Sequence, residues 1–496
     1  MARKNVSDDN TEVFTQAQFL SPFTWRYGSD TLRRIWSEEH YRLLWRRLWL
    51  ALAEAQHGVG LVNDAELADL RAHVQDIDIP RAHAIERETR HDVMAEIRTY
   101  AEQATVGGGK LHLGATSADI EDNADVLRLR ESLAYVLQRL GGVLHALAGQ
   151  IERHAERLCM AYTHLQPAEP TTLGYRLAMY AQDFLLDLRQ LRWVGEQLRG
   201  KGFKGAVGTS ASYTLLLDGL ADDASSLEDR TLATFNLPAY PIAGQTYPRK
   251  QDVLVLNVLA SIAQSAYRFA FDVRVLQSPG FGELSEPFER NQIGSSAMPF
   301  KRNPRTTERV CSLARYVMAL PPVASGNAAH SLLERTLDDS AARRLILPEA
   351  FLAIDEILGA MQYVSAGLVV NDAAVERNLH AYGPFAGTER LLLTWVRQRG
   401  FGRQELHELI REAAMASWPA VQAGQPNPLA DRLADAAMAS GRVPGSYDAV
   451  HQEVLALLDP RAHVGNAVER CRAFAAELRQ ELQEVPRADA VAGPAY

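Results

Sequence analysis

The chain is poor in cysteine and in lysine. Its 496 residues include three cysteines, Cys159, Cys311 and Cys471, which are far apart and lack metal-ligand spacing. This pattern argues against a disulfide framework and against a zinc site, and it predicts a cytoplasmic protein. Six of the 52 basic residues are lysines, so 46 are arginines. A lysine kept in such an arginine-rich chain is a mild indication of a need for its compact ammonium, although the six lysines can equally be residual.

The chain also lacks an excess of positive charge, a long apolar run and an apolar leader. Asp and Glu (61) outnumber Lys and Arg (52), and the resulting net charge of -9 predicts no binding to nucleic acid or anionic lipid. No apolar run approaches the roughly 18 residues of a membrane span, and the polar start from Met1 to Thr15 predicts no signal peptide. Apolar residues are abundant, at 47%, which is enough for a large core. The length of 496 residues predicts about three domains.

Long stretches have the three- and four-residue apolar spacing of amphipathic helices. Such helices are predicted over residues 38–59, 91–104, 117–158, 171–198, 251–276 and 344–369. Several of them exceed the usual length of roughly 10–14 residues, and alternating strand patterns are almost absent. We therefore predict an all-α fold built on a bundle of long helices. The predicted domains are an N-terminal helical domain (1–112), a central long-helix domain (113–370) and a small C-terminal domain of shorter helices (371–496), which ends in a frayed tail from Val485.

One long segment, from Ser278 to Pro304, is too rich in glycine and proline for a helix. It contains the run GSSAMPFKRNP, from Gly294 to Pro304. Glycine at one end and proline at the other suit a lid that becomes ordered over a ligand. The cations Lys301 and Arg302 would attract a carboxylate or a phosphate. An ordinary surface loop is the alternative interpretation.

Other polar groups stand at breaks between predicted helices. His91 and Asp92 begin one helix, where Asp92 could simply cap it. Thr116 and Ser117 precede the longest helix, where they can act as caps or border free backbone N–H groups that bind an anion. His164 lies in a break between two long helices. It can project into a cleft and titrate near neutral pH, or it can be an ordinary core or surface histidine.

Two groups of residues could bind anions. Arg335, Ser340 and Arg344 lead into a long helix, and their spacing could bring them onto one anion. The forked guanidinium of arginine suits phosphate in particular. Arg26 and Tyr27 near the N-terminus offer another contact. For each group the alternative is a solvated charge.

Taken together, these segments resemble the adenylosuccinate lyase family of the fumarase/aspartase superfamily. The run from Gly294 to Pro304 closely resembles the signature loop of that superfamily. Eight segments match in collinear order and cover most of the chain. They are Arg26-Tyr27, RHDVM (90–94), LGATS (113–117), THLQPAEPTT (163–172), KGAVGTSAS (204–212), GQTYPRK (244–250), GSSAMPFKRNP (294–304) and ERTLDDSAARR (334–344).

The resemblance implies a fold, an assembly and a reaction. It implies three helical domains and a homotetramer whose active sites lie where three subunits meet. The implied reaction is β-elimination of fumarate from N-succinyl purine nucleotides. These are adenylosuccinate, which gives AMP, and succinylaminoimidazole carboxamide ribotide (SAICAR), which gives AICAR. No metal and no organic cofactor is expected.

The resemblance also implies roles for particular residues. Ser295 resembles the general base, which would be activated in part by Lys301, and His164 resembles the general acid. His91 resembles a histidine that holds the substrate and assists the acid. The further expected substrate contacts are Arg26, Tyr27, Arg90, Asp92, Thr116, Ser117, Gln245, Asn303, Arg309, Arg335, Ser340 and Arg344.

Two alternatives stay open. The first is a lyase of the same superfamily that releases fumarate from another N-succinyl compound in specialised metabolism. A substrate without phosphate would not need the arginine-rich groups at Arg26 and Arg335. The second is a structural protein recruited from a lyase. The presence of Ser295, His164 and His91 together disfavours that alternative.

Overall fold

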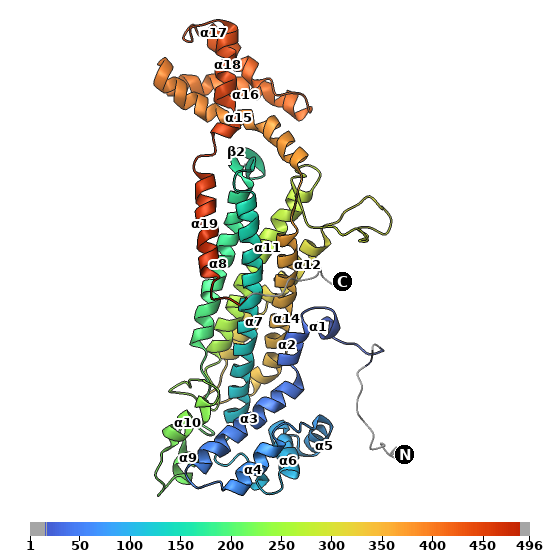
Figure 1. Cartoon of the computed structure of the whole chain (residues 1–496), viewed down its shortest axis with the longest axis vertical. Helices are drawn as coiled ribbons and strands as arrows, with labels where there is room; N and C mark the ends of the chain where they lie inside the picture. Colours follow the sequence, from blue (N-terminus) through green and yellow to red (C-terminus); the bar gives the residue numbers. More distant parts are fainter. Residues whose placement is uncertain (1–14, 16, 487–496) are drawn as a thin grey trace.

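The computed structural model describes residue 15 and residues 17–486 of the chain. It is an elongated bundle of helices with a small group of helices at either end (Figure 1). The all-α prediction is confirmed, although two short two-stranded sheets accompany the helices. The predicted tail lies mostly in residues 487–496, outside the described part.

Long helices that pack side by side form the central bundle. They are α7 (Ser117–Arg153), α8 (Leu173–Gln197), α11 (Lys250–Gln277), α12 (Arg305–Met318), α13 (Pro321–Ala329) and α14 (Asp338–Ala366). The predicted spans over residues 117–158, 171–198, 251–276 and 344–369 match four of these within a few residues. Pro321 is the first residue of α13, a position whose backbone N–H makes no hydrogen bond within the helix, so proline costs nothing there. It separates α12 from α13.

The N-terminal helices pack at one end of the bundle. They are α1 (Pro22–Trp25), α2 (Asp30–Ile35), α3 (Glu38–His57), α4 (Asp64–His73), α5 (Ile79–Thr89), α6 (Asp92–Gln103) and the 3-10 turn η1 (Gly108–Lys110). The short helices α9 (Ala211–Leu216) and α10 (Ala224–Ala233) lie at the same end (Figure 1). Ser37 caps α3, whose buried residues Leu44, Leu48 and Leu52 form one face of a helix that packs against α7.

The C-terminal helices form a separate core at the other end. They are α15 (Asp372–Arg399), α16 (Arg403–Gln422), α17 (Leu429–Ala439), α18 (Tyr447–Leu458) and the 3-10 turn η2 (Pro460–Ala462). The expectation of shorter helices after Asn371 is wrong for α15, which has 28 residues. The last helix, α19 (Ala467–Glu481), leaves this group and packs against α7 and α8. The domain boundaries stay a prediction.

A β-hairpin stands in the break between α7 and α8, where the sequence indicated no strand. Its strands β1 (Leu158–Thr163) and β2 (Gln166–Thr172) pair antiparallel, with Thr163 opposite Gln166. The two residues of the turn, His164 and Leu165, have φ of 53° and 60°. Positive φ at both positions is the type I′ pattern that matches the twist of a hairpin. The second sheet pairs β3 (Leu284–Ser285) with β4 (Val369–Val370).

Among the described residues, α11 is long and apolar enough to cross a membrane by length and composition. The sequence analysis predicted no such run. In the fold, 56% of its apolar window is buried inside the chain, between α8, α12 and α14. A central helix of a bundle meets the same criteria as a membrane span, because it is apolar around most of its circumference.

Candidate active site

A cavity of about 420 Å³ opens at the N-terminal end of the bundle, between α3, α7 and α14. Four residues singled out in the sequence line it: Asp92, Arg335, Ser340 and Arg344. Arg344 donates from Nη2 to Oδ2 of Asp92 at 3.0 Å. The fold thus brings two segments that are about 250 positions apart onto one wall. Cationic and hydroxyl groups on one wall suit an anionic ligand.

His91, not Asp92, caps helix α6. The backbone N–H of Met94 donates to Nδ1 of His91 at 3.4 Å. Asp92 is the first residue of the helix rather than its cap: its Oδ1 accepts the backbone N–H of Val93 at 2.8 Å, and its Oδ2 accepts from Arg344. Arg90 ends α5 with φ of 57°, which turns the chain sharply between the two helices. This turn places His91 and Asp92 at the start of α6.

Thr116 and Ser117 begin α7 as expected. Thr116 is the N-cap residue, and its backbone N–H donates to Oδ2 of Asp119 at 3.0 Å. The capping interpretation therefore holds for Thr116. Both side chains remain half-buried at the start of the helix, where N–H groups can still meet an anion.

A buried ionic network forms part of the cavity wall, and the sequence did not reveal it. Arg249 donates to both carboxylate oxygens of Asp122, at 3.1 and 3.0 Å, and to Asp339 at 2.5 Å. Asp339 immediately precedes Ser340 at the start of α14. The network therefore fixes the helix end that presents Ser340 and Arg344.

Arg343 extends this network. It lies 2.7 Å from Asp252 and 2.9 Å from Asp125. One sequence signal could have revealed the network: Asp119, Asp122 and Asp125 recur every three residues on one predicted helix, and all three are buried in the structure. Buried carboxylates require cationic partners, so such a row predicts arginines or lysines from elsewhere in the chain.

The electrostatics of the cavity divide its carboxyl groups into two kinds. Burial alone would raise the pKa of Asp125, but Arg343 and Arg128 outweigh it and hold the pKa below its ordinary value. Glu121 also lines the cavity, but Arg344, which lowers its pKa, is outweighed by burial and by the neighbouring carboxylates. Burial, followed by the charges of Asp92 and neighbouring aspartates, raises its pKa to about 8. Glu121 is therefore largely protonated at neutral pH.

Two of the scarce lysines prove to be structural. Lys201 is fully buried and pairs with Asp119, and Lys204 pairs with Glu228 at 2.6 Å. Asp119 also accepts the backbone N–H of Gly205 at 3.2 Å. These pairs fold the glycine-rich segment KGAVGTSAS onto the start of α7.

His164 stands exposed at the tip of the hairpin, at the opposite end of α7. The hairpin is anchored below its tip, because Tyr162 donates to Glu283 at 2.7 Å and Arg176 pairs with the same carboxylate at 2.9 Å. A non-glycine turn with positive φ is strained, and strain of this kind persists where the surrounding structure supports it.

The segment with Ser295 is an exposed loop between α11 and α12 (Figure 1). Ser295 Oγ accepts the backbone N–H groups of Met298 at 3.1 Å and of Ala297 at 3.4 Å. At the base of the loop, the side chain of Asn303 donates to the carbonyl of Gly294 at 2.9 Å. Lys301 is exposed on the same loop.

Arg26, Tyr27 and Arg309 lie together in a separate surface cavity of about 340 Å³. The fold therefore does not bring Arg26 next to Arg335 within one chain. Arg309 is held by Glu356 at 3.0 Å. The backbone N–H of Gln245 donates to the carbonyl of Glu334 at 3.0 Å, which places Gln245 close to the segment of Arg335.

The candidate residues thus form separate groups on one chain. Thr116 and His164 flank α7, whose 37 residues span about 55 Å at 1.5 Å per residue. A nucleotide-sized ligand cannot touch both ends of such a helix on the same chain.

The fold and the family models together define a lyase. A model described as "Lyase" matches residues 29–319. Among solved structures, a fumarate lyase from Mesorhizobium sp. BNC1 superposes with a TM-score of 0.78 at 22% identity, over 91% of this chain and 98% of that one. A 3-carboxy-cis,cis-muconate lactonizing enzyme from Pseudomonas putida superposes with a TM-score of 0.79 at 24% identity, over 92% of this chain and 99% of that one. The helical fold is that of fumarase/aspartase-superfamily lyases.

The family within this class follows from closer relatives. A model described as "Adenylosuccinate lyase C-terminus" matches residues 384–474. The adenylosuccinate lyase of Schistosoma mansoni is 38% identical over 92% of this chain and 94% of the relative. The adenylosuccinate lyase of Saccharomyces cerevisiae is 37% identical over 92% of this chain and 94% of the relative. That of Pyrococcus abyssi is 35% identical over 80% of this chain and 87% of the relative. The chain belongs to the adenylosuccinate lyase family and is a C–N lyase.

Proposed function

We propose that this chain releases fumarate by β-elimination from adenylosuccinate, giving AMP, and from SAICAR, giving AICAR. The observation that carries the proposal is the cavity wall of Arg335, Ser340 and Arg344 beside Asp92. Both substrates carry a phosphate, and two arginines and a hydroxyl on one wall suit that group. Family membership supports the same reaction.

The reaction requires removal of a proton beside a carboxylate and then protonation of the leaving nitrogen. In this proposal Ser295 is the base. The N–H groups of Ala297 and Met298 that point at its Oγ stabilise negative charge developing there. His164 is the acid, since its exposed position at the hairpin tip allows it to reach a ligand that lies outside its own chain. His91 orients the substrate near Asp92.

The active site is proposed to be shared between subunits of a homotetramer. The separation of Thr116 from His164 along α7 supports this, because residues from several chains could then surround one substrate. An exposed apolar stripe on α8 supports it too. Met179, Leu186 and Trp193 recur every seven residues on the exposed side of that helix, as they do in helices that pack against a partner. The free and buried cysteines fit the proposed cytoplasmic location.

An assay with three compounds tests the function. The purified protein is given adenylosuccinate, SAICAR or phosphate-free N-succinyladenosine, and fumarate release is followed spectrophotometrically. We expect turnover of the two nucleotides, and little turnover of the nucleoside. Preferred cleavage of a phosphate-free compound would instead support the lyase of specialised metabolism.

Two variants test the roles within the loop. Ser295→Ala should abolish turnover, whereas Ser296→Ala should be mild. The reverse result would show that the base is assigned to the wrong serine. Light scattering on the active protein tests the assembly, and a fully active monomer would contradict shared sites.

A further inference from the structure

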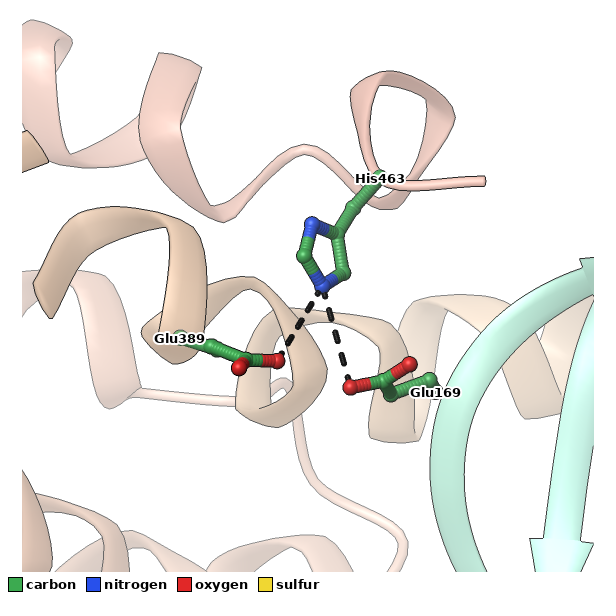
Figure 2. Close-up of side chains that lie close together, drawn as sticks. All are labelled: Glu169, Glu389 and His463. Carbon is green, nitrogen blue, oxygen red and sulfur yellow. Dashed lines mark ion pairs between the residues drawn. The ribbon is translucent and has the colours of Figure 1, made fainter. Parts of the chain in front are cut away.

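A second cluster of titratable side chains lies where the hairpin that carries His164 meets the C-terminal helices, away from the cavity of Asp92 and Arg344. Glu169 comes from β2, Glu389 from α15, and His463 follows η2 (Figure 2). Nε2 of His463 lies 3.5 Å from Oε2 of Glu389 and 3.8 Å from Oε1 of Glu169. One donor atom of each of the three side chains lies within 4.8 Å of the other two. Three segments distant in sequence thus point donor atoms at one spot.

Close backbone packing holds these segments together. Two glycines one turn apart on α15 let the chain before His463 approach the helix. A Cβ on Gly383 would lie 2.9 Å from the Pro460 ring, and a Cβ on Gly387 would lie 2.5 Å from Cα of Leu458. Because both contacts require glycine, backbone packing alone sets the position of the chain before His463 relative to α15.

The hairpin side of the cluster is packed as well. Met160 of β1 is fully buried against Leu379 and Ala386 of α15. Since β1 and β2 are paired, this contact also sets the position of Glu169 relative to Glu389. The three donors therefore stand on elements whose backbones are already fixed, which is the arrangement that a preformed ligand site needs.

The charges of the cluster are unbalanced. A carboxylate oxygen of Glu169 and one of Glu389 lie within 4.8 Å of each other. The imidazole of His463 faces both carboxylates, and even when protonated it brings one positive charge against two negative ones. A divalent cation would balance both carboxylates, while the neutral imidazole remains available as a ligand.

We propose that Glu169, Glu389 and His463 form a binding site for a first-row divalent transition-metal ion of the Zn²⁺ or Mn²⁺ type. Donors at about 2.0–2.2 Å from a tetrahedral ion lie roughly 3.3–3.6 Å from one another. The separation of 3.5 Å already fits this geometry, and that of 3.8 Å reaches it by a small side-chain rotation. An imidazole among the ligands favours a transition ion over Mg²⁺ or Ca²⁺. Water would complete the coordination, since both glutamates are exposed.

The site would tie the hairpin to the C-terminal helices. Glu169 lies on the same hairpin as His164, so the bound ion would restrain the element that carries His164 at its tip. The ion would act on the structure and takes no part in the elimination. The proposal stands apart from the proposed lyase activity, and binding of the ion can be measured without any substrate.

Titration of the full-length, chelator-treated protein with Zn²⁺, and separately with Mn²⁺, tests this site by calorimetry. We expect one ion per chain for at least one of the two metals. His463→Gln and Glu389→Gln should each weaken binding about tenfold or more. His380→Gln is the matched control. His380 is an exposed histidine on α15, the helix of Glu389, and it faces one carboxylate, Glu376, at 3.6 Å. It should leave binding unchanged.

A second readout separates loss of the site from loss of the fold. The ion should raise the melting temperature of the wild-type protein and of the His380→Gln variant by a few degrees, and that of His463→Gln by much less. Circular dichroism checks that each variant is folded. Absence of binding of either ion to the wild-type protein overturns the proposal. Binding that is equally tight in His463→Gln also overturns it.

Discussion

Replacing Arg249 by methionine tests whether the buried ionic network supports the cavity. Arg249 bridges Asp122 and Asp339, and all three residues are at least 95% buried. Asp339 occupies the first turn of α14, directly before Ser340. Methionine fills a similar space without a charge, so the variant leaves two buried carboxylates without their shared cation.

The expected cost follows from the partners that remain. Breaking a buried ion pair by removing one partner costs about 3–5 kcal/mol. Two carboxylates are affected, but each keeps one donor: Asp339 keeps Arg335 at 2.9 Å, and Asp122 keeps the backbone N–H of Tyr247 at 2.8 Å. We therefore expect a loss of about 3–5 kcal/mol in the free energy of unfolding rather than twice that amount.

The measurement is urea unfolding followed by circular dichroism at one fixed protein concentration, because the proposed association of subunits would contribute to stability. Arg249→Lys keeps the charge but lacks the planar fork that makes three hydrogen bonds to the two carboxylates, so it should lie between the wild type and Arg249→Met. Adding Asp122→Asn to Arg249→Met should restore part of the loss, since the amide oxygen can still accept the N–H of Tyr247. An unchanged unfolding midpoint in Arg249→Met would refute the reasoning, as would a further loss in the double variant.

Three further changes probe the loop, the cavity and the hairpin. Gly294→Ala should slow turnover about tenfold or more, because its Cβ would lie 2.0 Å from the carbonyl oxygen of Lys301. Gly280→Ala, whose Cβ meets nothing within 4 Å, is the control, and equal rates for the two variants in a steady-state assay would contradict this. Glu121→Gln should flatten the pH dependence of stability: burial raises the folded pKa from 4.5 to about 8, so the wild type loses stability as the pH rises between these values. Melting temperatures at pH 5 and pH 8 check this, and a variant no more stable than wild type at pH 8 would count against it. Leu165→Asn should stabilise the chain by about 1 kcal/mol, because asparagine tolerates positive φ better than leucine does. The exposed leucine side chain loses little packing, and a lowered melting temperature would argue against strain in the turn.

The sequence predicted the long helices well because their apolar spacing is a local property. It failed where packing decides the outcome. Glycine and proline are usually helix breakers, and α15 contains Gly383, Pro384 and Gly387. In the structure they lie inside one helix of 28 residues, since the two glycines receive Pro460 and Leu458 at close range.

The hairpin was missed for a related reason. Its strands are short, and Pro167 and Pro170 interrupt the second one, so local pattern predicts a break. What makes the segment a hairpin is the packing of Met160 against α15, together with the anchoring of Tyr162 on Glu283. Neither contact can be inferred from spacing along the chain.

Candidate site residues were found mainly where they stand at helix ends, because such positions are visible in the sequence. Asp92, Ser340 and Arg344 were selected in this way, and the fold places them on one wall. The supporting network was not found, because its pairs, such as Arg249 with Asp122, are about 130 positions apart. The available signal was a row of buried acidic residues on one helix. It identifies the carboxylate of each ion pair but not the cation that pairs with it.

The two glycine-rich segments differ in how the fold holds them. The segment at Gly202–Gly208 is tied by Lys201 to the start of α7, beside the cavity. The loop of Gly294 instead projects from the bundle, between α11 and α12 (Figure 1). A segment held by a buried ion pair can position a ligand without moving, whereas an exposed loop closed at its base by Asn303 can move as a unit. In the proposed shared site, a fixed wall from one chain would meet a mobile loop from another. Substrate binding should then protect the backbone amides of the loop of Gly294 from hydrogen exchange far more than those around Lys201.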